Sequence, residues 1–263
     1  PLFQVLVRMQ LNGVHIDSKL LNKMSTTLGD QIYQVESSLR SLLGYEFNLN
    51  SSRELSEVLF AQLNLPYTKR TQKGNYSTDA SSLDTIREMI SNGVVNDPDP
   101  RSMTFLDGVS EYRQMSKIKS TYVDSLPDLV NKKTNRIHTR YNQTGSSTGR
   151  ISSNEPNVQN IPVRTELGRS VRNAFVAEKR PEWTLLSADY SQIELRVLAH
   201  ISEDPGLISA FKDGQDIHTA TAASVYDVPA DIVDSDMRRV AKIMNFGVLY
   251  GLSPFGISKQ TGL

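Results

Sequence analysis

The chain has 263 residues, no cysteine, and 29 basic against 29 acidic residues, so its net charge at pH 7 is zero. This length can hold one large domain or two to three small ones. The composition excludes a disulfide framework and a thiolate metal site. The sequence also has no apolar run that would span a membrane and no signal peptide. It starts with Pro1 rather than Met and stops at Leu263 shortly after a predicted helix, so we expect both ends to be cut.

The first half of the chain is predicted to be mostly helical. Apolar residues recur at three- and four-residue spacing, and turn-forming pairs such as Asn12-Gly13 break the pattern. The predicted helices cover residues 1–12, 18–43, a stretch from 50, 82–91 and 104–131. Residues 66–82 and 92–102 are polar and rich in turn formers, so we predict exposed loops there.

The pattern changes after residue 131. Residues 137–143 alternate like a strand, and residues 144–162 are rich in Gly, Ser, Thr, Asn and Pro. Residues 185–188 form a short apolar run, which predicts a buried strand that ends at Asp189. Helices are predicted again over residues 191–202, in parts of 206–227 and over 231–250.

Charge is distributed unevenly along the chain. Residues 101–180 hold 14 Lys and Arg against 7 Asp and Glu, whereas residues 181–234 hold 2 against 10. A basic block followed by an acidic block suits a protein that holds a polyanion beside metal-binding carboxylates. Ordinary variation along a soluble chain is the alternative.

The segment 238–250, RRVAKIMNFGVLY, carries the most informative pattern. Four residues recur at every fourth position: Arg238, Lys242, Phe246 and Tyr250. On a helix they form one stripe of two cations and two aromatic rings. Cations suit phosphates, and aromatic rings suit base or sugar faces. A merely amphipathic helix is the alternative reading.

The other face of the same helix is predicted to be buried. Its apolar residues are Met237, Val240, Ala241, Met244 and Val248. Gly247 lies within the predicted helix, where glycine costs about 1 kcal/mol relative to alanine, so we expect another segment to pack closely there. Gly251 is well placed to end the helix.

The segment 184–196, TLLSADYSQIELR, holds two carboxylates with competing interpretations. Asp189 follows the predicted strand and is either a turn former or a metal ligand. Magnesium is bound by one or two carboxylates together with substrate phosphate oxygens, which Asp189 can satisfy. Ser191 and Glu194 have the spacing of a capping box, which gives Glu194 a structural role.

The turn-rich segment 148–164 contains four side chains that suit nucleic acid. They are Arg150, Gln159, Asn160 and Arg164. Side-chain amides can read acceptors in the minor groove, and arginines can hold phosphates. A polar surface loop is the alternative. His218 lies near a predicted helix start, where a lone histidine is more often structural than functional.

Taken in order, these motifs resemble family A DNA polymerases, with the bacterial DNA polymerase I type most similar. The motifs are TGR followed by PNVQNIP, then DYSQIELR, then RRVAKIMNFGVLYG. Residues 117–127 and 138–150 also resemble that family, so the similarity covers essentially the whole chain. It implies an α+β fold with a partial right-hand architecture. The expected parts are a palm entry segment (1–20), a helical thumb (21–130), a palm with a small antiparallel sheet (131–205) and incomplete helical fingers (206–263).

The resemblance also implies roles for individual residues around a nucleotide. Asp189 matches the catalytic metal-binding carboxylate, and Tyr190 would lend its backbone carbonyl to a metal. Glu194 matches the residue that excludes the ribose 2′-hydroxyl while bonding Tyr250. The expected nucleotide contacts are Arg238, Lys242 and His218 on the triphosphate, Phe246 against sugar and base, Tyr250 near the templating base, and Gln192.

By the same resemblance, a second set of residues would contact DNA. Arg150, Gln159 and Asn160 match residues at the primer end and the minor groove. The remaining expected contacts are Arg164, Lys117, Lys119 and Asn142.

The implied reaction is template-directed transfer of a nucleotide from a dNTP to a primer 3′-hydroxyl. Two Mg²⁺ ions are expected in the intact enzyme, with Mn²⁺ as an alternative. The family supplies the second carboxylate in a His-Asp-Glu motif, and none of the four histidines here is followed by Asp. We therefore expect that this chain is a fragment of the polymerase domain and that it does not extend primers by itself.

The expected partners are primer–template DNA and deoxynucleoside triphosphates, with no membrane partner. We expect the protein to be a monomer in a bacterial cytoplasm, either a bacterial protein at the nucleoid or a protein encoded by a phage. Its expected role is in DNA replication or repair. Two alternatives stay open: a non-catalytic, sequence-independent DNA-binding fragment, or one half of a split polymerase.

Overall fold

The computed structural model describes residues 1–163, 165–179 and 181–262. The chain divides into two compact units, Pro1–Leu185 and Leu186–Leu263. Arg164, one of the expected DNA contacts, lies outside the described residues. Within those residues, no helix combines the length and the apolar composition needed to cross a bilayer.

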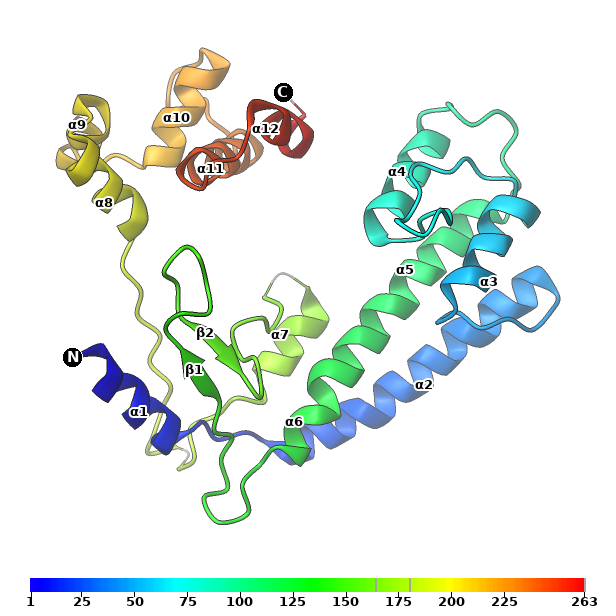
Figure 1. Ribbon diagram of the computed structural model, residues 1–263, viewed down its shortest axis with the longest axis horizontal. Coiled ribbons are helices and arrows are strands. Elements are labelled where there is room, and N and C mark those ends of the chain that lie inside the picture. The colour runs from blue at the N-terminus through cyan, green and yellow to red at the C-terminus, as the bar shows by residue number, and fades with distance from the viewer. Residues whose placement is uncertain (164, 180, 263) are drawn as a thin grey trace. The chain divides into compact units, whose positions relative to one another are not determined.

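The first unit is mainly helical (Figure 1). Its helices are α1 (Leu2–Asn12), α2 (Ser18–Leu43), α3 (Ser52–Glu57), η1 (Val58–Gln62), α4 (Ala80–Ser91), α5 (Ser102–Ile118), η2 (Lys119–Val123), α6 (Ser125–Asp128) and α7 (Glu166–Arg172). Two short strands, β1 (Arg140–Asn142) and β2 (Ser152–Asn154), lie between α6 and α7 in the sequence. The elements η1 and η2 are π-helical turns.

The long helices α2 and α5 lie side by side in the first unit (Figure 1). Helix α2 begins where the carboxylate of Asp17 accepts a hydrogen bond of 3.0 Å from the amide of Leu20. It ends at Gly44, whose φ of 80° suits a left-handed cap. Its buried residues are Leu21, Leu28 and Leu39. They are spaced by about two and three helical turns, so they lie along one face.

Two apolar clusters stabilise the first unit. One joins α2 to α3, η1, α4 and α5, and its fully buried members include Leu55, Leu59 and Phe105. The other joins α2 to α5, η2 and α7, with Ile137 and Val171 inside it. Full burial of such a side chain contributes about 1.5–3 kcal/mol, so these clusters are the main source of stability.

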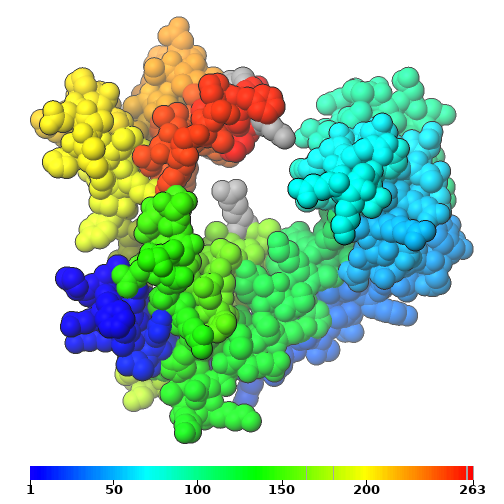
Figure 2. Space-filling model, in the orientation of Figure 1, coloured from blue at the N-terminus to red at the C-terminus, as the bar shows by residue number. Residues whose placement is uncertain are grey.

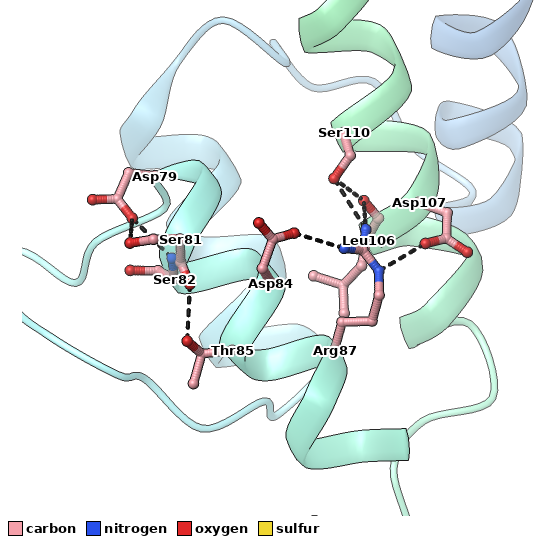
Figure 3. A network of polar contacts seen from close by, with 9 residues as sticks. All are labelled: Asp79, Ser81, Ser82, Asp84, Thr85, Arg87, Leu106, Asp107 and Ser110. Carbon is pink, nitrogen blue, oxygen red and sulfur yellow. Dashed lines mark hydrogen bonds and ion pairs between the residues drawn. The ribbon is translucent and has the colours of Figure 1, made fainter. Parts of the chain in front are cut away.

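Arg87 links α4 to α5 through polar contacts (Figure 3). Its guanidinium donates to Asp84 at 2.8 Å within α4 and to Asp107 at 2.9 Å on α5. It also donates to the hydroxyl of Ser110 at 3.1 Å. Since both carboxylates are 63% exposed, each ion pair contributes only about 0–1 kcal/mol, and the network mainly fixes the direction of Arg87.

The small sheet consists of β1 paired antiparallel with β2, with Tyr141 opposite Ser153. Helix α1 packs against strand β1, and Figure 2 shows the dark blue N-terminal residues beside green residues. The side chain of Gln10 accepts a hydrogen bond of 2.7 Å from the amide of Tyr141. The predicted strand 137–143 is thus shorter than expected, and the segment 144–162, which we predicted as turn-rich, contributes its partner.

The second unit contains five described helices: α8 (Ile193–Ser202), α9 (Pro205–Lys212), α10 (Ile217–Tyr226), α11 (Ser235–Leu249) and α12 (Pro254–Thr261). Its small core is built around Leu195, Ala210 and Ile217. Helices α10 and α11 pack against each other, which brings the segments 217–226 and 235–249 together.

One predicted element is wrong, and the helix predicted over residues 104–131 is present but interrupted. The apolar run 185–188 is not a strand, and Leu186 is 90% exposed. A strand needs a neighbour for its backbone hydrogen bonds, and no described segment pairs with this one. The predicted helix 104–131 is divided into α5, η2 and α6, because the amide of Asp124 bonds to the carbonyl of Lys119, five residues back.

Candidate functional site

The stripe of cations and aromatic rings lies on helix α11 and at its end. The carboxylate of Asp234 caps this helix by accepting hydrogen bonds from the amides of Asp236 and Met237 at 2.9 and 2.8 Å. The helix ends at Leu249, before Gly251 with its φ of +74°. The stripe residues are Arg238, Lys242 and Phe246 within the helix and Tyr250 directly after it. The predicted helical spacing is therefore confirmed for the first three residues.

The opposite face of α11 is only partly buried. Val240 and Ala241 are buried as predicted, but Val248 is 65% exposed. The prediction for Val248 is wrong because no described element covers that side of the last helical turn. Gly247 is closely packed, since a Cβ there would lie 3.0 Å from Cδ2 of Leu252. The predicted close approach at this glycine is confirmed.

Asp216 connects the stripe to α10. Its carboxylate caps that helix by accepting a 2.9 Å hydrogen bond from the amide of Thr219. It also forms an ion pair of 2.8 Å with Nη2 of Arg238, and Gln192 lies at 3.5 Å. Burial would raise the pKa of Asp216, but the hydrogen bonds from Arg238 and Thr219 outweigh burial and lower it to about 2. Asp216 is therefore ionised at neutral pH and holds the first cation of the stripe.

His218 is buried between α10 and α11, with only 3% of its surface exposed. Its Nδ1 lies 3.1 Å from Nδ2 of Asn245, and its ring centre lies 5.7 Å from that of Phe246. Burial lowers the pKa of His218; Asp216 opposes this shift, and Arg238 and Lys242 reinforce it. At neutral pH the imidazole is therefore uncharged.

Glu194 does not form the predicted capping box with Ser191. Helix α8 starts at Ile193, and its N-cap is Gln192, which has a left-handed conformation and makes no capping hydrogen bond through its side chain. Glu194 is thus the second helical residue, one position short of where a capping box needs it. The hydroxyl of Tyr250 instead donates a 2.6 Å hydrogen bond to Oε2 of Glu194. The contact that the resemblance implied between these two side chains is present.

Asp189 and Tyr190 lie in the exposed segment before α8, and Tyr190 is 80% exposed. Among the described residues, no three His, Asp or Glu side chains gather as metal ligands. Asp189 fits Mg²⁺ in part, because this ion is bound by one or two carboxylates together with phosphate oxygens. Asp189 alone does not make up a site of protein ligands among the described residues.

The expected DNA contacts lie in the first unit. Arg150, Lys117, Asn142, Gln159 and Asn160 are exposed. The amide of Gln159 accepts from the backbone of residue 153 at 3.0 Å and donates to the carbonyl of residue 151 at 2.9 Å, so it also shapes β2. Asn142 accepts a 2.9 Å hydrogen bond from the amide of residue 144. These side chains thus have local structural partners as well as exposure.

Lys119 differs from the other expected DNA contacts because it is already paired. Its side chain is 23% exposed, and its Nζ lies 2.8 Å from the carboxylate of Asp124. It also donates to the hydroxyl of Ser25 on α2 at 3.0 Å. The ammonium group of Lys119 therefore joins two helices in this structure.

Sequence reasoning missed three polar residues of this site: Asp216, Thr221 and Asn245. The hydroxyl of Thr221 donates to Oδ1 of Asn245 at 3.1 Å, so both residues belong to the contacts of His218. One signal was available. Asparagine has a low helix propensity, and Asn245 lies next to Phe246 in the interior of a predicted helix. This position indicates that the side chain of Asn245 has a polar partner.

Three comparisons with known proteins agree with one another. The sequence profile described as DNA polymerase family A matches residues 18–263. DNA polymerase I, thermostable, of Thermus aquaticus is 46% identical over 264 residues, which cover 100% of this chain and 30% of that protein. DNA polymerase I of Pseudomonas aeruginosa is 44% identical over 263 residues, with 100% and 27% covered.

A solved structure is also similar: the POL domain of Pol1 from M. smegmatis in complex with DNA primer-template and dNTP. It superimposes with a TM-score of 0.83 at 38% identity, over 99% of this chain and 43% of that one. The chain spans only about 30% of the length of the curated relatives it matches.

Proposed function

The chain belongs to DNA polymerase family A, and on that premise we propose that it is part of a DNA-directed DNA polymerase that binds a dNTP on helix α11. The relatives are named DNA polymerase I, and the similar solved structure is a complex with primer–template and dNTP. The proposed reaction transfers a nucleotide to the primer 3′-hydroxyl and releases pyrophosphate.

The observation that carries this proposal is the arrangement of α10 and α11. Arg238 and Lys242 are exposed on the stripe, and the neutral ring of His218 lies beside Phe246. Two cations and a neutral donor suit the triphosphate, and the ring of Phe246 suits the sugar and base. The cations also stabilise the negative charge that develops on the leaving pyrophosphate.

Two further side chains would select the sugar. The hydroxyl of Tyr250 fixes one oxygen of Glu194 at 2.6 Å, which limits the directions this carboxylate can take. The rings of Phe246 and Tyr250 lie nearly parallel, with an interplanar angle of 17° and centres 6.5 Å apart. We infer that Glu194, held by Tyr250, occupies the place that a ribose 2′-hydroxyl would need.

Asp189 and the backbone carbonyl of Tyr190 would hold divalent ions, with Mg²⁺ expected and Mn²⁺ as an alternative. Bound ions of this kind stabilise the attacking and leaving oxygens of a phosphoryl group. Asp189 accepts no hydrogen bond from the described residues, so its carboxylate is free to serve as a ligand. Since the sequence contains no His-Asp-Glu motif, we propose that the 263-residue chain alone does not extend primers.

The first unit would bind the duplex. In this proposal residues 21–130 form a thumb, residues 131–205 a palm, and residues 206–263 part of the fingers. The exposed side chains Arg150, Gln159 and Asn160 would contact the primer end and the minor groove. Binding through phosphates should weaken steeply with salt.

Nucleotide binding by the 263-residue chain tests the proposal. We expect Lys242→Ala to weaken dNTP binding by about 10-fold or more, because a charge-assisted contact with phosphate is lost. The same variant should bind primer–template as the wild type does. Lys212→Ala, which changes an exposed lysine of α9, is the matched control.

Other results would favour different functions. Equal losses of nucleotide and DNA binding in Lys242→Ala would contradict the assigned role of Lys242. Salt-sensitive DNA binding that no dNTP tightens would favour a non-catalytic DNA-binding fragment. Primer extension by the purified chain, abolished by Asp189→Ala, would show that the chain has a complete metal site.

A further inference from the structure

Asn245 lies between His218 and Thr221, and its two side-chain ends have different partners. The hydroxyl of Thr221 on α10 donates to Oδ1 of Asn245 at 3.1 Å. The amide nitrogen Nδ2 of Asn245 lies 3.1 Å from Nδ1 of His218, which is 3% exposed. Since Asn245 is on α11, it connects the buried histidine across the contact between the two helices.

This arrangement fixes where the imidazole carries its proton. A carboxamide has an oxygen that only accepts and a nitrogen that only donates. In this structure the Thr221 hydroxyl donates to the oxygen end, and the nitrogen end faces Nδ1 of His218. A donor is satisfied only by an acceptor, so Nδ1 must be unprotonated. A neutral imidazole then carries its single proton on Nε2, at the other nitrogen of the ring.

We propose that Asn245 is a positioning residue that holds His218 as the Nε2–H tautomer, so that a neutral ring presents one N–H donor to the phosphates of a nucleotide. This inference rests on the proposed function for its ligand, but the tautomer itself is a property of the nucleotide-free chain.

A neutral donor has a consequence for pH dependence. The charged groups near the ring are Asp216, which favours its protonation, and Arg238 and Lys242, which oppose it together with burial. Because burial lowers the pKa of His218 below the ordinary histidine value of about 6.5, the ring donates to phosphate as a neutral group at and above neutral pH. The wild-type chain should therefore show no step in dNTP affinity that belongs to His218 between about pH 7 and 8.

Substitution of Asn245 should change both the tautomer and the pH profile. In Asn245→Asp, a carboxylate replaces the donor, so Nδ1 would carry a proton and the added negative charge would raise the pKa of His218. We expect dNTP affinity in this variant to rise as pH falls from about 8 to 6 as the ring becomes charged. In Asn245→Leu the ring loses its partner, and we expect affinity to fall by about 3- to 10-fold at all pH values.

Thr221 offers a milder pair of variants. Thr221→Val keeps the shape of the side chain but removes the hydroxyl that orients Asn245, whereas Thr221→Ser retains the hydroxyl. We expect Thr221→Val to show a mixture of the two neutral tautomers and reduced dNTP affinity. Thr221→Ser should behave as the wild type, which separates the hydrogen bond from packing.

The decisive measurement is ¹⁵N NMR of the histidine rings in the 263-residue chain, without nucleotide. The chain has four histidines, and loss of one signal in His218→Gln assigns the ring of interest. We expect the proton on Nε2 at pH 7; a proton on Nδ1, or a charged ring, would overturn the inference. Because this readout needs no ligand, it distinguishes failure of the tautomer from failure of the proposed function. If the wild type binds no dATP at all, the proposed function fails instead.

Discussion

Asp216 offers a prediction whose size follows from two contacts that can be removed separately. Asp216→Asn removes the charge that pairs with Arg238 but keeps an oxygen that can cap α10, because Asn and Asp cap helices about equally well. The ion pair joins side chains that are 46% and 37% exposed, so solvent screening limits it to about 0.5 kcal/mol. Asp216→Ala also removes the cap on the amide of Thr219, which costs about 1 kcal/mol more.

The assay is amide hydrogen exchange, which reports the free energy of opening of α10 itself. Relative to the wild type, we expect α10 to open more easily by about 0.5 kcal/mol in Asp216→Asn and by about 1.5 kcal/mol in Asp216→Ala. Asp231→Asn, which removes an exposed carboxylate with no described partner, is the control and should leave α10 unchanged.

The pH dependence follows from the lowered pKa of Asp216, which is about 2 instead of 3.8. A lowered pKa means that the carboxylate stabilises the folded state fully above its ordinary value and loses this effect as pH falls through about 2. The difference between the wild type and Asp216→Asn should therefore be constant above about pH 5 and should shrink below about pH 4. Equal effects of the two substitutions, or a difference that grows on acidification, would refute this reasoning.

Three other outcomes can be checked on the same chain. Glu194→Ala should reduce the ratio of dATP affinity to ATP affinity in equilibrium binding. Tyr250→Phe should reduce this ratio to a smaller extent, because it releases the carboxylate of Glu194. An unchanged ratio in both variants would contradict the proposal that Glu194 excludes the ribose 2′-hydroxyl. Gly168→Ala should lower the free energy of unfolding in urea by about 1–3 kcal/mol, because the new Cβ would lie 2.6 Å from Cβ and the carbonyl oxygen of Pro162. Gly29 lies within α2, and a Cβ there would lie 3.7 Å from its nearest neighbour, Cε of Lys119. Gly29→Ala should therefore increase the free energy of unfolding by about 0.5–1 kcal/mol. Equal effects of the two glycine substitutions would contradict the packing described for Gly168.

Local signals in the sequence were sufficient for much of the helical structure. The predicted helix 18–43 has the bounds observed for α2, because Asp17 and Gly44 mark its ends in ways that do not depend on the rest of the fold. The stripe on α11 was predictable for the same reason, since helical spacing alone places Arg238, Lys242 and Phe246 on one side.

Features that depend on pairing between distant segments were not predictable. The apolar run 185–188 has the composition of a strand, but a strand also requires a neighbour that composition cannot supply. The predicted capping box at Glu194 is absent because helix α8 starts one residue later than the prediction required. The cap that Asp216 forms with Thr219 is local, but its ion pair with Arg238 and the contacts of Asn245 arise only when α10 packs on α11, and no spacing within either helix predicts them.

The π-helical turn η2 gives α5 a property that regular helices lack. Such a turn contains one residue more than an α-helical turn, so the residues beyond it are rotated by about 100° relative to an uninterrupted α-helix of the same sequence. In this phase the ring of Tyr122 is buried and its hydroxyl donates a 2.6 Å hydrogen bond to the carbonyl of Asn160. A regular α-helix of the same length would rotate Tyr122 by about 100° and turn its hydroxyl away from that carbonyl. Deletion of one residue of the turn, such as Ser120, would instead remove the extra residue and leave the following residues in their present orientation. The π-helical turn therefore lets this helix hold one additional residue while Tyr122 keeps its contact with a distant loop.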